Sequence, residues 1–224
     1  MTEATMASKA ERPYLPAAGR DLFLPFYDLV TKVIGGDKAR RELLNQAHLR
    51  PNDRVLDIGC GTGTLAISLK QAYPGVQMVG LDPDPKALNR ARRKASRACV
   101  DVRFDQGFAD SLGYPSNSFD AVFSSFMFHH LETDVKQKTL SEVRRVLKPS
   151  GRLYFLDFEV QESASGHDHW QLFHSHKRLK DNSESRILTL LTQAGLADAK
   201  KVATRRAIFG LASVGYYEAL APGL

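Results

Sequence analysis

The chain has 224 residues, of which 43% are hydrophobic, which is enough to bury one core of ordinary size, so we expect a single structural unit. No apolar run reaches about 18 residues, and the first 20 residues lack the apolar stretch of a signal peptide, which predicts a cytoplasmic protein without a membrane-spanning helix. The two cysteines, Cys60 and Cys99, form no C-x-x-C pair, so neither a disulfide framework nor a zinc knuckle is expected.

Two helices are predicted before the first strand. Residues 21–34 have apolar side chains at helical spacing and end at a pair of glycines, and a second helix is expected over 37–48. Tyr27 lies on the first of them. Its hydroxyl can reach a ligand, or its ring can pack on the apolar stripe, and the sequence leaves both interpretations open.

A glycine-rich turn follows at residues 54–64 (RVLDIGCGTGT). The apolar run before it predicts a buried strand, and the apolar residues after it recur at helical spacing. Glycines let the backbone take positive φ and remove Cβ atoms that would keep a ligand away. The spacing is G-x-G-x-G rather than the G-x-G-x-x-G of a dinucleotide site, which weakens a pyrophosphate interpretation. Cys60 is interpreted as a small buried residue rather than a nucleophile.

Strand and helix alternate after this turn. A strand over 76–81 ends in Asp82, about 20 residues after the glycines, where a carboxylate commonly accepts hydrogen bonds from ribose hydroxyls. Such alternation predicts a parallel sheet covered on both faces, with ligands at the carboxyl ends of the strands. The later elements are expected at 102–104, 121–124 and 153–158 for strands and at 133–148 for a helix.

The helix that begins at Pro85 carries much of the positive charge. The chain has 31 Lys and Arg against 25 Asp and Glu, a net charge of +6. A solvated helix face is the simplest interpretation, and attraction to an anionic substrate, a membrane surface or nucleic acid is the alternative. No aromatic residue interleaves the basic ones, which argues against single-stranded nucleic acid. The basic residues are Arg90, Arg92, Arg93, Lys94 and Arg97.

Two alternating apolar and polar segments, 197–204 and 208–218, are joined by only three residues. So short a link cannot carry a parallel crossover, so these strands should be antiparallel neighbours.

Four motifs in register over about residues 53–158 resemble class I S-adenosylmethionine-dependent methyltransferases, in particular the branch with the ubiquinone and menaquinone methyltransferases. The motifs are VLDIGCGTG at 55–63, VGLD at 79–82, SFDAV at 118–122 and RVLKPSGRL at 145–153. The resemblance implies an α/β, doubly wound, mostly parallel seven-stranded sheet with an antiparallel final hairpin and N-terminal cap helices. It divides the chain into 1–50, with the cap helices, and 51–224, the methyltransferase domain with an insertion at about 160–182 that would lie over the pocket.

The resemblance also assigns residues to S-adenosylmethionine. The backbone at Gly59, Cys60 and Gly61 would lie along the methionine and ribose, Asp57 would orient the loop or the amino group, and Asp82 would accept from the ribose. Further contacts are expected from Tyr27, Pro83 and Ser124.

The adenine position departs from the family pattern. Where the family usually has Gly-Asp-Ala, this chain has Gly-Phe-Ala, so the carboxylate is missing at Phe108. The Phe108 ring would stack on adenine with the Ala109 N–H donating to a ring nitrogen, or Asp110 would replace the carboxylate. Phe108 as an ordinary core residue is the alternative.

Methyl transfer needs alignment of the nucleophile, exclusion of water and, for some acceptors, removal of a proton. The candidate bases are His129 and His130, just beyond the fourth strand, with His129 preferred; a histidine that only hydrogen-bonds backbone is the alternative. Substrate contacts are expected from Phe126, Asp157 and Trp170. Trp170 lies among four histidines over 167–176. These histidines either lie on the surface or contact the substrate, metal binding is the least favoured alternative, and no metal is expected.

The predicted function is methyl transfer from S-adenosylmethionine to a small, apolar or aromatic acceptor. Signatures of nucleobase, arsenic and metal-dependent catechol methylation are absent from the positions that would carry them. The alternatives are a non-catalytic S-adenosylmethionine sensor or scaffold and, less favoured, an NAD-dependent oxidoreductase. Neither nucleic acid nor stable membrane insertion is expected, weak contact with a membrane surface is allowed, and the oligomeric state is open.

Overall fold

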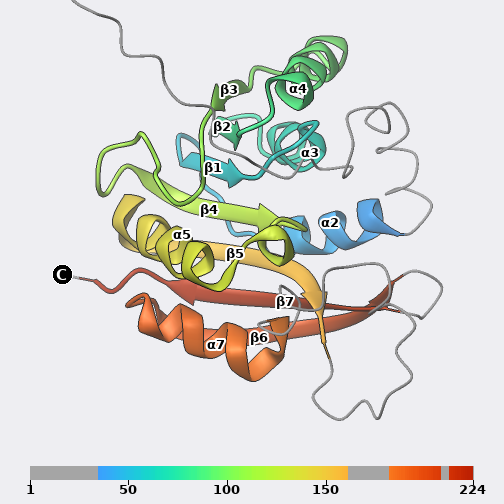
Figure 1. Cartoon of the computed structure of the whole chain (residues 1–224). Helices are drawn as coiled ribbons and strands as arrows, with labels where there is room; N and C mark the ends of the chain where they lie inside the picture. The colour runs from blue at the N-terminus through green and yellow to red at the C-terminus, as the bar shows by residue number, and fades with distance from the viewer. Residues whose placement is uncertain (1–34, 161–181, 208–211, 224) are drawn as a thin grey trace, which may run out of the picture.

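The computed structural model describes residues 35–160, 182–207 and 212–223. The predicted helix over 21–34 and the insertion at about 160–182 lie largely outside these ranges. The described elements alternate along the chain as the sequence predicts (Figure 1). They are α2 (Gly36–Asn45), β1 (Arg54–Ile58), α3 (Thr64–Ala72), β2 (Gln77–Asp82), α4 (Pro85–Arg97), β3 (Arg103–Gln106), β4 (Phe119–Ser125), the 3-10 turn η2 (Phe128–His130), α5 (Thr133–Val146), β5 (Leu147–Glu159), α7 (Glu184–Gln193), β6 (Ala197–Ala207) and β7 (Ala212–Leu220).

The seven strands form one sheet in the order β3-β2-β1-β4-β5-β7-β6. The pairs among β1 to β5 are parallel, whereas β7 is antiparallel to both β5 and β6. The predicted final hairpin is therefore confirmed, and so is the doubly wound fold. The strand order reverses between β1 and β4, and in such sheets ligands bind beyond the carboxyl ends of the strands at this point.

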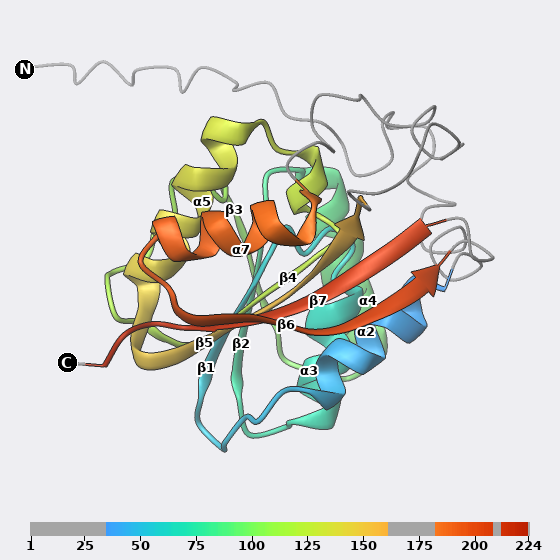
Figure 2. The same ribbon diagram turned by 90° about the horizontal axis from the view of Figure 1, so that it is seen from below.

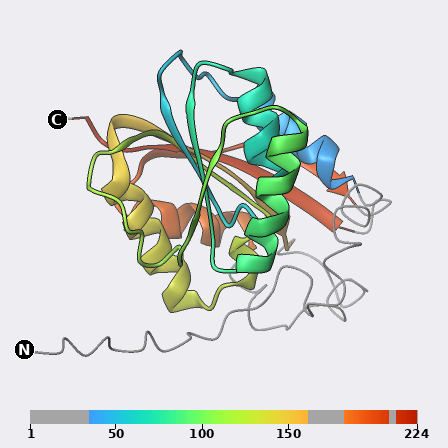
Figure 3. The same ribbon diagram turned by 90° about the horizontal axis from the view of Figure 1, so that it is seen from above.

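Helices cover both faces of the sheet (Figures 2 and 3). One core packs α2, α3 and α4 on side chains such as Val55, Phe123 and Tyr216, and the other packs α5 and α7 on side chains such as Leu56 and Phe155. The alternation of inward positions along each strand supplies both cores, because successive side chains point to opposite faces. In the described part of the chain, no helix is long and apolar enough to cross a membrane.

Several boundaries differ from the predicted ones. β5 begins at Leu147 rather than Leu153, because Leu147 already pairs with Phe119 before a register shift in the ladder. α2 lies in the helical layer beside α3, and its buried Ala39 and Leu43 pack into that core. Arg40, in the middle of this helix, lies 5.4 Å from the centre of the Phe126 ring, so α2 reaches the end of β4 through this side chain.

Local sequence explains where the helices begin. Asp84 caps α4 by accepting a hydrogen bond from the Lys86 N–H at 2.8 Å, and Pro85 occupies the first helical position. α3 instead begins after Gly63 in the left-handed region, which lets the chain turn directly from the glycine loop into the helix.

Candidate functional site

The glycine turn between β1 and α3 uses its three glycines in two ways. Gly59 and Gly63 make room for protein atoms: a Cβ at Gly59 would lie 2.7 Å from the Met127 Cβ, and one at Gly63 would lie 2.9 Å from the Ala91 Cβ. Gly61, with φ 53, has no described atom within 4 Å of its Cβ position. The open side of the turn is therefore at Gly61, where a ligand can approach the backbone.

Two buried carboxylates lie on either side of this opening. Asp57, in β1, is completely buried. Neither of its carboxylate oxygens has a hydrogen-bond partner of normal geometry among the described residues, although the backbone N–H of Ala66 is close enough to lower its pKa. Burial raises the pKa of Asp57 to about 7, while the positive charge of Arg40 lowers it and the negative charge of Asp82 raises it further. An unpartnered buried carboxylate is costly, so Asp57 is suited to a ligand that brings a positive charge or hydrogen-bond donors.

Asp82, at the end of β2, holds the turn in place. One carboxylate oxygen accepts from the Gly61 N–H at 2.8 Å, and the other accepts from the Asp84 N–H at 2.9 Å. Burial raises the pKa of Asp82 to about 6, although these hydrogen bonds lower it. Each oxygen keeps one acceptor position, so the carboxylate can still accept from a pair of hydroxyls such as a ribose diol.

Arg40 is a site residue that the sequence analysis missed. It is 8% exposed, and its guanidinium lies 5.4 Å from the centre of the Phe126 ring and close enough to Asp57 to lower the pKa of that carboxyl. A signal was available, because Arg40 lies three residues before Leu43 on the buried stripe of α2. A buried cation usually has a partner, and Arg40 forms an ion pair with Asp37 at 3.6 Å on the same helix as well as lying near Asp57.

Cys60 is built into the turn rather than presented to a ligand. Its N–H donates to the Leu81 carbonyl at 3.0 Å, and its carbonyl accepts from the Gly63 N–H at 2.8 Å. Burial raises the pKa of the Cys60 thiol well above its usual range, with further contributions from Asp57 and Asp82. The thiol is therefore a poor nucleophile.

The residues expected at the adenine lie in the loop after β3. Gln106 ties this loop to the loop after β2, because its side-chain amide donates to the Pro83 carbonyl at 3.1 Å. Phe108, Ala109 and Asp110 are all partly exposed, and Phe108 belongs to neither hydrophobic core. Phe108 therefore lies at the edge of the described fold, in the loop where the adenine contact is expected.

The carboxyl end of β4 carries two of the predicted site residues. Ser124 is buried, and its hydroxyl has no hydrogen-bond partner within the described ranges. Phe126 has φ 55, a conformation in which a bulky side chain is an outlier. Its ring is held between Arg40 and Phe158, whose ring centre is 5.0 Å away. Strained residues of this kind cluster at functional sites.

His129 and Asp157 form a buried pair across β4 and β5. His129 Nδ1 lies 2.5 Å from one carboxylate oxygen of Asp157, and the backbone N–H of His129 donates to the other oxygen at 3.1 Å. Burial alone would raise the pKa of Asp157, but the adjacent His129 ring and the hydrogen bonds from His129 and Phe158 hold it below its usual value. The sequence analysis expects Asp157 to contact substrate, and in the structure both of its carboxylate oxygens contact His129.

His130 packs on His129 with ring centres 4.0 Å apart.

A buried lysine, Lys136, approaches the end of β5. Its ammonium donates to the Asn182 side chain at 2.8 Å, and the Asn182 side chain donates to the Phe158 carbonyl at 3.1 Å. Two of the predicted site residues, Tyr27 and Trp170, lie outside the described residues, as do the histidines over 167–176.

No group of three His, Cys, Asp or Glu side chains within residues 35–160, 182–207 and 212–223 is arranged to hold a metal ion.

The comparisons indicate the class of the domain. Residues 55–151 match the family model of a methyltransferase domain. The structure is similar to phosphoethanolamine N-methyltransferase 2 of Haemonchus contortus, with a TM-score of 0.77 at 18% identity over 92% of this chain and 58% of that one. This likeness shows the fold alone.

Among curated relatives, the chain is similar to two demethylmenaquinone methyltransferases. It is 43% identical over 137 residues to that of Deinococcus radiodurans, covering 60% of this chain and 56% of the relative. It is 40% identical over 137 residues to that of Thermus thermophilus, covering 60% of this chain and 61% of the relative. The chain therefore matches somewhat more than half the length of each relative.

Proposed function

We propose that the protein transfers a methyl group from S-adenosylmethionine to a small, apolar aromatic acceptor. The observation that carries this proposal is the pair of buried carboxylates, Asp57 and Asp82, beside the open backbone at Gly61. S-Adenosylmethionine brings an ammonium group, a sulfonium and a ribose diol, and each of these complements a carboxylate.

The same electrostatics disfavour NAD. A pyrophosphate at this turn would place negative charge near two buried carboxylates, and like charges in a low-dielectric site repel strongly. Dinucleotide sites instead place the pyrophosphate on free N–H groups at a helix start. Here the Gly61 N–H is already donated to Asp82.

Arg40 and Asp57 would together bind the amino-acid end of the cofactor. An arginine suits a carboxylate because its guanidinium presents paired donors, and Asp57 suits the ammonium. The hydroxyl of Ser124, which has no hydrogen-bond partner among the described residues, would contact the middle of the bound cofactor. Phe108 would contact its adenine.

The bound cofactor would supply an electrophilic methyl group, so the chain's own residues mainly have to place the acceptor and take its proton. Asp157 fixes the ring of His129 through Nδ1, which leaves Nε2 as the basic nitrogen of the neutral imidazole. When Nε2 takes a proton from an acceptor hydroxyl, the Asp157 carboxylate stabilises the resulting imidazolium. His129 is thus the base, and Asp157 is a positioning residue.

The acceptor class is suggested by the named relatives and by the site. Demethylmenaquinone is apolar and aromatic, and the rings of Phe126 and Phe158 pack together beside Arg40 and His129. We propose a quinol-type acceptor of this chemistry.

Calorimetry with S-adenosylmethionine, S-adenosylhomocysteine and NAD tests the cofactor. We expect binding of both sulfur ligands and none of NAD; NAD binding without them would contradict the proposal. Transfer of labelled methyl groups to a panel of quinols, phenols, amines and thiols tests the reaction. Tight cofactor binding with no methylated product across the panel would favour the sensor or scaffold.

A further inference from the structure

The positive charge of the chain is concentrated on one helix. α4 carries six basic residues and no acidic one. The whole chain has 31 Lys and Arg against 25 Asp and Glu, so α4 alone accounts for the net charge of +6 and the remainder is balanced. The basic residues are Lys86, Arg90, Arg92, Arg93, Lys94 and Arg97.

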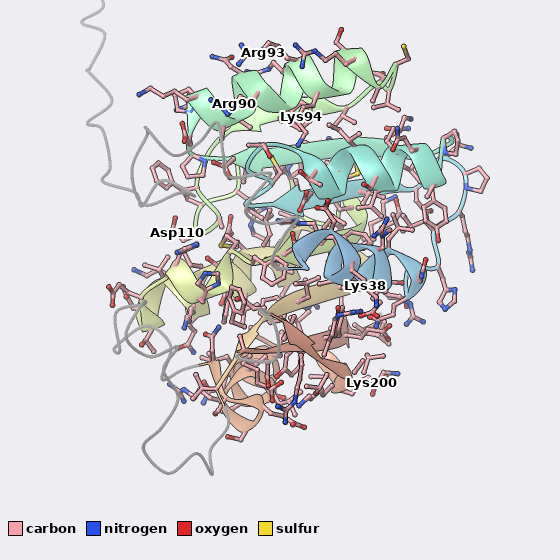
Figure 4. All side chains as sticks on the ribbon, turned by 90° about the vertical axis from the view of Figure 1, so that its right-hand side faces the viewer. Lys38, Arg90, Arg93, Lys94, Asp110 and Lys200 are labelled. Atoms are coloured by element: carbon pink, nitrogen blue, oxygen red, sulfur yellow. The ribbon has the colours of Figure 1, made fainter. Side chains whose placement is uncertain are left out.

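These residues do not all point the same way. Lys94 turns toward α3 and donates to the hydroxyls of Thr62 and Thr64 (Figure 4). Arg92 reaches back to the Phe104 carbonyl at 2.8 Å. Both side chains therefore stabilise the packing of α4 on its neighbours.

The outer face of α4 is different. Lys86, Arg90, Arg93 and Arg97 recur at intervals of four, three and four residues, so they form one row along the helix. Figure 4 shows Arg93 on the side of α4 that faces away from α3. Arg93 and Arg97 are exposed, and neither has an ion-pair partner among the described residues. The charges of Arg93 and Arg97 are therefore not neutralised within the described fold.

We infer that this row, called the α4 basic face, docks the protein on an anionic phospholipid bilayer. Basic clusters of this size on an amphipathic helix attract anionic lipid, at about 1 kcal/mol for each Lys or Arg near the surface. The helix is about 20 Å long, so the row can contact several headgroups in one plane. Arginine also matches phosphate oxygens with paired donors.

One observation favours a bilayer over single-stranded nucleic acid. α4 has no aromatic side chain on which a base could stack, which single-stranded recognition commonly requires. Val202, on β6, is the one large apolar side chain exposed among the described residues, so the contact through α4 is electrostatic and does not insert.

Docking also fits the proposed function, on which its biological purpose rests. An apolar acceptor partitions into a bilayer, and a protein held at the surface meets it at higher local concentration. Asp84, the cap of α4, is two residues after Asp82, so the α4 basic face begins close to the proposed cofactor site.

Co-sedimentation with vesicles tests the inference without cofactor or acceptor, so its failure is separate from failure of the proposed function. We expect the protein to bind vesicles that contain about 30% phosphatidylglycerol, and this binding should weaken as the salt concentration rises. Vesicles of pure phosphatidylcholine should bind little protein. The double variant Arg93→Glu/Arg97→Glu should bind at least about 30-fold more weakly, from about 1 kcal/mol per lost cation.

The matched control is Lys138→Glu/Arg152→Glu, which changes the net charge equally through exposed residues of α5 and β5. It should keep most of the vesicle binding, and calorimetry with S-adenosylhomocysteine checks that both variants remain folded. Equal loss in the two variants, binding to both lipid mixtures alike, or tighter binding to an RNA duplex at the same salt would overturn the inference.

Discussion

Replacing Asp57 by Asn should change how stability depends on pH. A carboxyl whose pKa is higher in the folded protein than in the unfolded chain stabilises the fold fully at low pH, and this contribution is lost as pH rises through the folded pKa. The pKa of Asp57 rises from 3.8 to about 7, because the carboxyl is completely buried. Above that pH the folded protein carries a negative charge that is removed from water, and the nearby Arg40 and Ala66 N–H offset this cost only in part.

The size of the effect follows from this shift. About three pKa units at about 1.4 kcal/mol each give an upper limit of about 4 kcal/mol. Relative to Asp57→Asn, the wild type should lose about 1.4 kcal/mol of unfolding free energy per pH unit between about pH 5 and pH 7, and nothing further above about pH 8. The amide keeps the shape of the side chain but has no proton to lose.

This difference is measured by urea unfolding of both proteins without ligand at several pH values from about 5 to 8.5. At each pH the unfolding free energy is extrapolated linearly to zero urea. Asp101→Asn is the control, because Asp101 is exposed and should show no such slope. A stability difference between wild type and Asp57→Asn that does not vary with pH would refute the burial account. Donor binding supplies an independent check: affinity for S-adenosylmethionine should rise with pH up to about 7 in the wild type and be weak and flat in the variant.

Three further substitutions test the other parts of the site. Asp82→Ala should weaken binding of S-adenosylmethionine by at least about 100-fold in calorimetry, since hydrogen bonds to a charged group contribute about 1.5–3 kcal/mol each, and retained affinity would contradict the ribose assignment. Asp157→Asn should lower kcat by about 100-fold and alter the pH profile of the reaction while the donor Kd stays within about twofold, because it acts through His129; an unchanged rate would remove His129 as the base. Phe108→Ala should weaken both S-adenosylmethionine and S-adenosylhomocysteine by about tenfold, from a stacking contribution of about 1 kcal/mol and lost apolar contact, and equal affinity would show that its ring does not touch adenine.

The sequence was sufficient for the parts of the site that are local. The glycine turn lies between a strand and a helix as the spacing predicts, and Asp82 ends β2. The hairpin of β6 and β7 followed from the short link between two alternating segments. In each case a few consecutive residues determine the backbone path, so a pattern over a short window is enough.

The contacts between distant elements were not predictable in the same way. His129 and Asp157 are 28 residues apart, and their pairing depends on how the end of β4 lies against β5. Arg40 comes near Asp57 only because α2 packs in the layer beside α3. A pattern places such residues on an element, but only the assembled sheet decides which of them meet.

The place of β7 in the sheet has a consequence for how the protein folds. β6 precedes β7 in the chain, yet β6 pairs with β7 alone and lies at the edge, while β7 lies between β6 and β5. During synthesis, β6 therefore emerges before the only strand that can pair with it. The hairpin is a local contact and can form by itself, whereas joining β7 to β5 closes a much longer loop, and long loops are entropically costly. We expect the docking of this hairpin to be the slow step that completes the sheet.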